Sequence, residues 1–216
     1  MKSAAKTLNI SVNPNTLNYD ITYHKLEFTV NPAVASIAGK VTTTYTALAN
    51  MSTITFDKAN ALIVSAVKKG GVNLSFTQPT TDELVITLPA VQPIGTSATI
   101  EVTYAGDPTA SGFGSFITEM HNSVPVLYTL SEPFGARDWW PCKQDLNDKI
   151  NTIDVYITAP SQYVTVSNGV EPEAPVVVGA NKTTHFRHNY AIPAYLIAIA
   201  VTNYQVHNQQ GGLGTT

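Results

Sequence analysis

The chain has 216 residues, of which Asp, Glu, Lys and Arg make up 12%, about half the share in an average protein. Its formal net charge of −3 gives no support to nucleic-acid binding, which usually requires a basic face. The length suits one large β domain or two small ones. Cys142, the one cysteine, cannot form an internal disulfide, so it does not indicate the redox compartment.

The first residues contain no apolar stretch of the kind that a signal peptide needs. A basic residue follows Met1, but no hydrophobic segment comes behind it. The longest nearly continuous apolar run, residues 191–201, contains Pro193 and is too short to cross a bilayer. We therefore expect a soluble protein without a membrane partner. It would be cytoplasmic, or secreted or periplasmic with the signal peptide removed.

Alternation of apolar and polar residues predicts β-strands along most of the chain. The alternation begins between Tyr19 and Val30, where its phase slips by one residue and so predicts a β-bulge or a break. The later sets are Val41, Thr43, Tyr45 and Ala47; Val72, Leu74 and Phe76; Leu84, Ile86 and Leu88; Ala98, Ile100, Val102 and Tyr104; and Ile153, Val155 and Ile157. These sets predict strands with one buried face.

Turn residues separate the strands, and helical periodicity is weak. Residues 69–71 and 78–82 have the composition of hairpin turns. Residues 106–123 are broken by Gly and Pro, so they predict a long loop before a strand at 125–128. Residues 143–150 could form a helical turn at most.

These patterns predict an all-β protein of about a dozen short strands. We expect antiparallel sheets in a sandwich or in an open, curved, saddle-like barrel, with little helix. Residues 1–18 are interpreted as an N-terminal extension and residues 19–205 as the all-β domain. Residues 206–216 are rich in Gly and Gln, which is typical of a flexible linker, here towards a further domain.

Motifs for metal binding and nucleophilic catalysis are absent from the sequence. There is no His-Glu-x-x-His helix and no Gly-x-Ser-x-Gly turn. His185 and His188 lie three apart in an expected strand, so they point to opposite faces and are interpreted as structural or surface residues. Cys142 is interpreted as a small buried side chain. We expect no metal and no cofactor in this chain.

The segment Ser131–Cys142 gathers a carboxylate, an arginine, both tryptophans and the cysteine. Glu132 is the candidate binding residue, because an ionised carboxylate can hold an ammonium group through a charge-assisted hydrogen bond. Leu130 and Phe134 indicate a partly apolar wall beside it. A solvated surface carboxylate is the alternative interpretation of Glu132.

The other special side chains of this segment are interpreted as structural. Arg137 and Asp138 are expected to be surface charges that help to fix the loop. Trp139 and Trp140 alternate in direction if the chain is extended, so one should pack in the core and the other in a lid or interface. We expect Glu132–Cys142 to lie at one edge of the domain and to be unusually exposed for its aromatic content.

The segment resembles one in the N-terminal domain of aminopeptidase N-type zinc exopeptidases, which are gluzincins. The resemblance begins near residues 19–21 and runs through Glu132–Cys142 and the expected strand at 154–160. It ends at residues 192–198, which look like the family's closing strand before the catalytic domain. The order and spacing of these pieces carry the resemblance.

The resemblance implies roles for individual residues. Glu132 matches the residue that holds the free amino group of a peptide substrate. Leu130, also near the substrate, stands where many members have Gln, and Arg137 matches a structural residue. The zinc ligands and catalytic groups would belong to another domain of the full-length protein, which would be this chain's partner. This chain would not be catalytic by itself.

Two other functions fit the sequence. The first is a non-catalytic β-sandwich module for adhesion or carbohydrate binding, in which Trp139 and Trp140 stack on a ligand; exposed, adjacent rings would favour it. The second is a stand-alone hydrolase with an unrecognised site, for which the sequence offers no nucleophile or metal motif.

Overall fold

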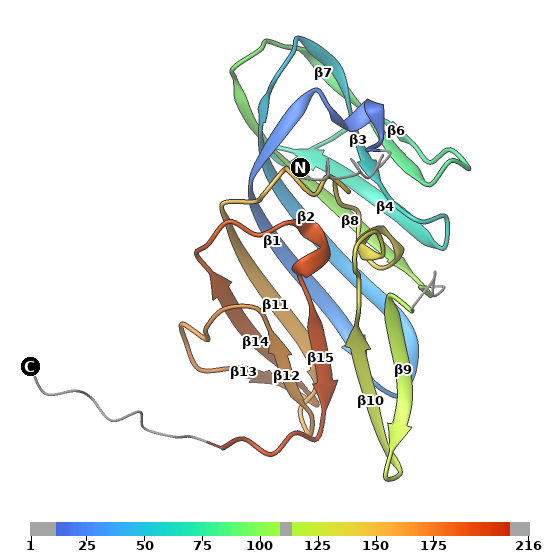
Figure 1. Cartoon of the computed structure of the whole chain (residues 1–216), viewed down its shortest axis with the longest axis vertical. Helices are drawn as coiled ribbons and strands as arrows, with labels where there is room; N and C mark the ends of the chain where they lie inside the picture. Colours follow the sequence, from blue (N-terminus) through green and yellow to red (C-terminus); the bar gives the residue numbers. More distant parts are fainter. Residues whose placement is uncertain (1–11, 109–113, 208–216) are drawn as a thin grey trace, which may run out of the picture.

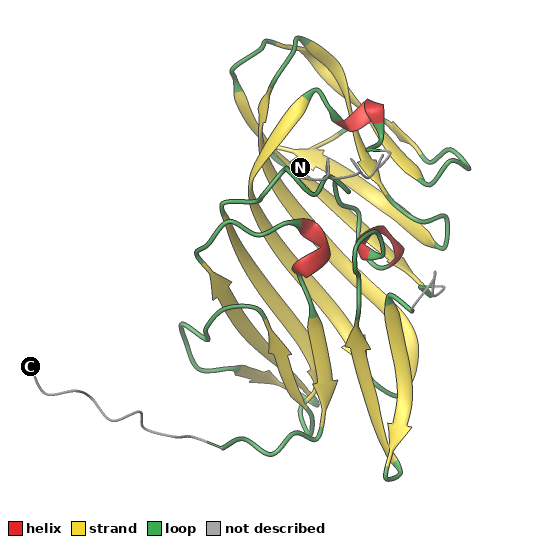
Figure 2. Ribbon diagram, in the orientation of Figure 1, coloured by secondary structure: helices red, strands yellow, loops and turns green. Residues whose placement is uncertain are grey.

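The computed structural model describes residues 12–108 and 114–207, and these form an almost entirely β structure (Figure 2). Three short 3-10 helices (η) accompany the strands. The elements are η1 (Pro14–Thr16), β1 (Tyr19–Asn31), β2 (Val34–Ala47), β3 (Met51–Asp57), β4 (Leu62–Lys69), β5 (Val72–Asn73), β6 (Phe76–Thr77), β7 (Glu83–Gln92), β8 (Ser97–Gly106), β9 (Phe116–His121), β10 (Val124–Thr129), η2 (Ala136–Asp138), β11 (Thr152–Pro160), β12 (Val164–Ser167), β13 (Val176–Val178), β14 (Asn181–His188), η3 (Ala194–Leu196) and β15 (Ile199–Thr202).

The strands form three open sheets. The largest has the order β13-β14-β11-β1-β2-β8-β4-β5, the second β12-β15-β10-β9 and the third β3-β7-β6. In Figure 1 the second sheet lies in front of the large one, and the third lies at the top of the view. The predicted all-β class with open sheets is confirmed. One feature was not predicted: β1 and β11 pair in parallel, which requires a long crossover connection rather than a hairpin.

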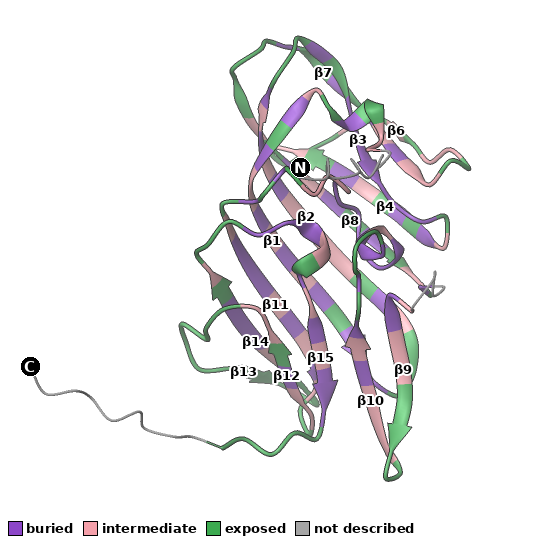
Figure 3. Ribbon diagram, in the orientation of Figure 1, coloured by how far each residue is buried: buried purple, intermediate pink, exposed green. Residues whose placement is uncertain are grey.

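The predicted alternation accounts for most of the core. Alternate residues from Val41 to Ala47 are at most 1% exposed. The predicted alternating residues of β7, β8 and β11 are also buried, except Ala98, which is partly buried. The predicted phase slip is confirmed, since the register of β1 against β2 shifts between Ile21 and Tyr23. Figure 3 shows the resulting stripes of buried and exposed residues along the large sheet.

Two predicted elements differ in the structure. Val72 and Phe76 do not share a strand, because β5 pairs with β4 and β6 pairs with β7 in another sheet, and Val72 is 68% exposed. The expected loop at 106–123 contains β9, an edge strand that forms a hairpin with β10. Asn122 and Ser123 make the turn with φ of 48° and 66°. In β9 only Phe116 is buried, so the sequence of this strand lacks the alternation of apolar and polar residues that would have predicted it.

The end of the domain also differs from the prediction. Residues 192–198 are not a strand: Pro193 precedes η3, and the last strand, β15, begins at Ile199. Proline lacks the N–H that a central strand would need. The strand expected at 154–160 is confirmed as β11. The boundaries predicted after residues 18 and 205 stay predictions, and residues 1–11 and 208–216 lie outside the described part. Within the described residues, no helix has the length and apolar character to span a bilayer.

Candidate functional site

The connection between β10 and β11 carries the candidate site and divides into two parts. Leu130, Glu132, Pro133 and Phe134, here called the crest, are exposed to solvent, Leu130 by 46% and Phe134 by 37%. Residues 135–142, here called the base, are buried apart from Arg137. The base includes η2, which Figure 3 shows as largely buried near the end of β10. An exposed crest thus stands on a buried support.

Glu132 is the charged residue of the crest. Its side chain is exposed, and its carboxylate forms no hydrogen bond or ion pair with any other described residue. The peptide bond that follows it, Glu132–Pro133, is cis. The Gly135 N–H donates to the carbonyl of Ser131 at 2.9 Å and closes a turn around Glu132. The carboxylate is therefore available to a ligand while its backbone is held in a turn.

The base packs directly on Ser115, which is 1% exposed. The Ser115 carbonyl accepts a hydrogen bond from the Leu130 N–H at 3.1 Å, and its hydroxyl donates to Oδ2 of Asp138. A Cβ at Gly135 would lie 2.3 Å from the Ser115 Oγ and 3.1 Å from the Cα of Ser131. Only glycine fits there, because the turn approaches Ser115 too closely for a side chain.

The prediction for the two tryptophans is wrong. Trp139 and Trp140 are both fully buried, with ring centroids 6.0 Å apart. Trp139 Nε1 donates to Ser131 Oγ at 2.9 Å, and the Trp139 ring packs against Phe28. Burial is favoured because each ring removes a large apolar area from water. The segment is therefore not unusually exposed for its aromatic content, although the crest is exposed.

Asp138 also differs from its expected position. It is 4% exposed and bonded to Ser115, so it is a buried support rather than a surface charge. Arg137 is half-buried; its guanidinium lies 3.9 Å from Asp82, and its carbonyl accepts from the Ala59 N–H at 2.9 Å. Through these bonds both residues fix the base, Asp138 to Ser115 just before β9 and Arg137 to the β3–β4 connection.

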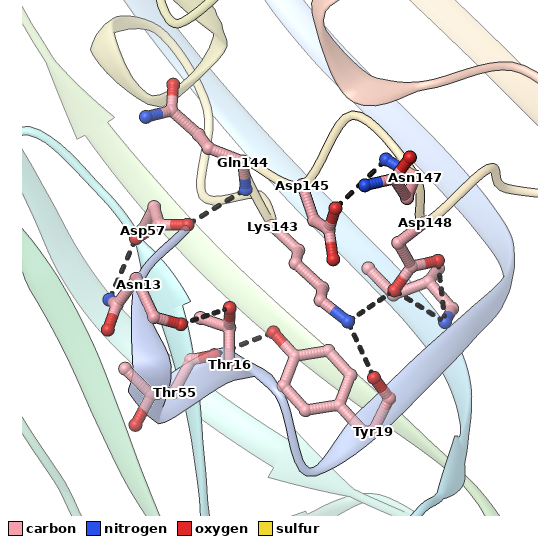
Figure 4. A network of polar contacts seen from close by, with 11 residues as sticks. Asn13, Thr16, Tyr19, Thr55, Asp57, Lys143, Gln144, Asp145, Asn147 and Asp148 are labelled. Atoms are coloured by element: carbon pink, nitrogen blue, oxygen red, sulfur yellow. Dashed lines mark hydrogen bonds and ion pairs between the residues drawn. The ribbon is translucent and has the colours of Figure 1, made fainter. Parts of the chain in front are cut away.

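A polar network fixes the chain just after the base (Figure 4). Lys143 Nζ donates to Asp148 Oδ2 at 2.6 Å and to the Tyr19 carbonyl at 2.7 Å. The Gln144 N–H donates to Asp57 Oδ2 at 2.8 Å. Burial raises the pKa of both Asp57 and Asp148, and hydrogen bonds to the ionised carboxylates oppose the shift. The network ties the base to β1 and β3.

Cys142 and the histidines offer no reactive centre. Cys142 is fully buried as predicted, and burial raises the pKa of its thiol, which disfavours the reactive thiolate. His185 lies between Asp154, at 2.7 Å, and Glu173, at 2.9 Å, whereas His188 packs against the ring of Tyr190. Among the described residues there is no group of three or more His, Cys, Asp or Glu side chains suited to a metal ion.

A second segment lies beside the crest. Pro133 and Ala136 line the same small hollow as Ala194 and Tyr195 of η3, although about sixty residues separate them in sequence. Leu196, the last residue of η3, is 41% exposed. Exposed Leu130 and Phe134 thus flank Glu132 in sequence, and exposed Leu196 belongs to the second segment beside this hollow.

Sequence reasoning missed Ser115 and Ser131, which support the turn. Ser115 fell within the expected loop at 106–123, and Ser131 was noted only as the first residue of the segment. A buried serine has no sequence pattern of its own, since its hydroxyl is equally common on the surface. The hairpin of β9 and β10 is what brings Ser115 under the base.

Comparison with known proteins identifies relatives of the same fold. The sequence model described as the Peptidase M1 N-terminal domain matches residues 15–196. The crystal structure of an M1 zinc metallopeptidase from Deinococcus radiodurans has a TM-score of 0.76 at 28% identity, covering 85% of this chain and 42% of that one. A mutant of a two-domain M1 zinc metallopeptidase bound to L-arginine has a TM-score of 0.77 at 26% identity, with the same coverage.

One curated relative, an aminopeptidase by name, matches a shorter stretch of the chain. Leucine aminopeptidase 2 of Chaetomium globosum is 35% identical over 81 residues, which are 37% of this chain and 13% of that protein. The chain spans less than half the length of these relatives. The resemblance inferred from Ser131–Cys142 is confirmed. The chain belongs to the Peptidase M1 N-terminal domain family.

Proposed function

We propose that this chain is the substrate-anchoring N-terminal domain of a zinc aminopeptidase, which removes the first residue of a peptide. Glu132 would accept hydrogen bonds from the free α-ammonium group of that peptide. One observation carries the proposal: the Glu132 carboxylate is exposed and has no hydrogen bond or ion pair with the described residues, while the turn that bears it rests on a buried base. Such a group combines availability with a defined position.

The chemistry of the crest suits an ammonium ion. A hydrogen bond to an ionised partner contributes about 1.5–3 kcal/mol, more than a bond between neutral groups. The contribution grows when water is excluded, because the charges then interact in a lower dielectric. Anchoring the amine would place the first peptide bond at a fixed distance from Glu132. The enzyme would thereby select the end of a chain over its interior.

Leu130 would contact the side chain of the first substrate residue. It lies two residues before Glu132, is 46% exposed, and offers only hydrocarbon groups. Contacts there would be dispersive rather than hydrogen-bonded. We therefore expect apolar first residues to be bound better than charged ones.

The apolar residues around Glu132 would also meet a catalytic domain of the same polypeptide. Leu130, Phe134 and Leu196 expose 46%, 37% and 41% of their surface, and they come from two segments beside one hollow. Covering such surface is favourable by about 25 cal/mol per Å². A domain packed here would exclude water from the Glu132 carboxylate.

Zinc would be held outside this chain. The described residues do not fit a zinc site, since catalytic zinc typically has about three protein ligands and no such set is present among them. When bound in a catalytic domain, zinc activates a water molecule for attack on a peptide bond. The role of this chain is to bind and orient the peptide, not to hydrolyse it.

The alternative of a carbohydrate-binding module loses its basis. That function needed Trp139 and Trp140 to stack on a ligand, and both rings are fully buried. No described feature favours it over amine binding.

The test is Glu132→Ala in a protein that joins this chain to its catalytic domain. We expect kcat/KM for a free peptide to fall about tenfold to a hundredfold, and the preference for free over blocked N-termini to fall in parallel. Glu132→Gln should lose less, because its amide oxygen still accepts a hydrogen bond. Glu171→Ala, at another exposed glutamate, is the matched control. Unchanged kcat/KM and an unchanged preference in Glu132→Ala would end the proposal; zinc content should be normal throughout.

A further inference from the structure

Ser115 contacts the turn that bears Glu132 on both sides of that residue. Before Glu132, the Ser115 carbonyl accepts the Leu130 N–H at 3.1 Å. After it, the Ser115 hydroxyl donates to the Asp138 carboxylate, and its Oγ lies directly beneath Gly135. A single buried residue, which lies just before β9, therefore connects the start and the end of the turn.

We infer that Ser115 is a positioning residue for Glu132, an inference that rests on the proposed function. Its carbonyl fixes the chain where it leaves β10, and its hydroxyl fixes Asp138, the last residue of η2. Between these points the turn is closed by the bond from the Gly135 N–H to the Ser131 carbonyl, 2.9 Å long. Ser115 itself does not reach a substrate, since it is 1% exposed.

The physical reason is preorganisation. A carboxylate on an untied loop loses conformational freedom when it binds a ligand, and that loss weakens binding. A turn tied at both ends has already lost this freedom when the protein folds. The free energy of the ammonium–carboxylate contact then appears in binding instead of being spent on ordering the loop.

The packing at Gly135 gives Ser115 little freedom of its own. A Cβ at Gly135 would meet the Ser115 Oγ at 2.3 Å and its Cβ at 2.9 Å, so the two residues are in close contact. Ser131, on the other side of the turn, is held by the Trp139 Nε1–H at 2.9 Å. The turn is thus fixed by one serine of its own and by one serine from outside it.

Ser115→Ala isolates the contribution of the hydroxyl, because the backbone bond to Leu130 remains. In this chain, amide hydrogen exchange reports the turn directly. We expect exchange at Gly135 to be about tenfold faster in Ser115→Ala, since the turn opens more often. Ser97→Ala is the control: it removes a serine hydroxyl that pairs with Thr46 at 3.0 Å in the large sheet, and it should leave exchange at Gly135 unchanged.

The second measurement uses the protein that contains the catalytic domain. Ser115→Ala should raise KM for a free dipeptide about tenfold with little change in kcat, and lower the preference for that dipeptide over its des-amino analogue. Val67→Ala, which opens a gap in the core at β4, should lower stability without changing that preference. Asp138→Asn keeps a hydrogen-bond acceptor for Ser115. Its KM and its preference for the free dipeptide should therefore stay closer to the wild-type values than those of Asp138→Ala.

The outcomes separate the two proposals. If Glu132→Ala leaves the amine preference unchanged, both the anchoring role and the positioning role are wrong. If Glu132→Ala abolishes the preference and Ser115→Ala changes neither exchange at Gly135 nor KM, only the positioning role is overturned. Faster exchange together with a raised KM for the free dipeptide supports it.

Discussion

Glu132 and Asp138 are carboxylates of the same connection, yet Glu132 faces solvent with no polar partner among the described residues, whereas Asp138 is 4% exposed and bonded to Ser115. The aromatic residues divide in the same way: Phe134 of the crest is 37% exposed, whereas Trp139 of the base is fully buried. A residue proposed to bind a ligand needs free hydrogen-bonding groups and a fixed position. In this connection, different residues meet these two requirements. The crest supplies the free group and the base supplies the fixed position.

If the base holds the crest in place, acid should destabilise the packing around the base rather than the crest. His24 packs edge-on against Trp140 at 5.2 Å, and its burial lowers its pKa from 6.5 to about 3. The folded state keeps His24 neutral, while the unfolded state takes up a proton as the pH falls below 6.5. This contribution to stability is therefore complete above pH 6.5 and is lost progressively towards pH 3, by at most about 5 kcal/mol.

The measurement is urea unfolding between pH 7.5 and 4 for the wild type and for His24→Gln. Asp57 and Asp148 act in the opposite direction, because their raised pKa values make the folded state take up protons first as the pH falls. The wild type and His24→Gln share that effect, so the difference between their pH dependences of stability reports His24. We expect His24→Gln to lose less stability in acid; identical pH dependence would contradict this role.

Trp139→Ala should lower the stability of the fold strongly, because it removes the main packing of the base. The side chain is fully buried, packs against Phe28 and Trp140, and donates a hydrogen bond to Ser131. Replacing a buried tryptophan by alanine typically costs about 3–5 kcal/mol, because a cavity replaces the ring. Chemical denaturation monitored by circular dichroism measures the loss. A stability change below 1 kcal/mol would show that the base does not depend on this ring.

Phe134→Ala, on the crest, should have the smallest effect. Its side chain is partly solvated in this chain, so we expect the free energy of unfolding to change by less than about 0.5 kcal/mol. In a protein that joins this chain to the proposed catalytic domain, the same change should weaken packing between the domains, because Phe134 would then be covered. Differential scanning calorimetry of both proteins measures the contrast. Equal effects in the two proteins would argue that no domain packs on the crest.

The sequence by itself determined the fold class and the location of the proposed site. Period-2 alternation, as from Val41 to Ala47, predicts strands because only a strand with one buried face repeats every two residues. The phase slip near Ile21 predicted the bulge for the same reason. The density of special side chains in Ser131–Cys142 indicated the site, and the resemblance of that segment to aminopeptidase N-type enzymes indicated the family.

The tertiary structure alone decided which side chains of the site are free. Nothing local distinguishes Glu132 from Asp138, or Phe134 from Trp139. The difference arises because the base packs on Ser115 and in the core while the crest does not. Ser115 acquires its place from the β9–β10 hairpin, and β11 pairs in parallel with β1, a partner more than 120 residues away in sequence. Contacts between such distant segments depend on how whole sheets pack, so no short window of sequence contains them.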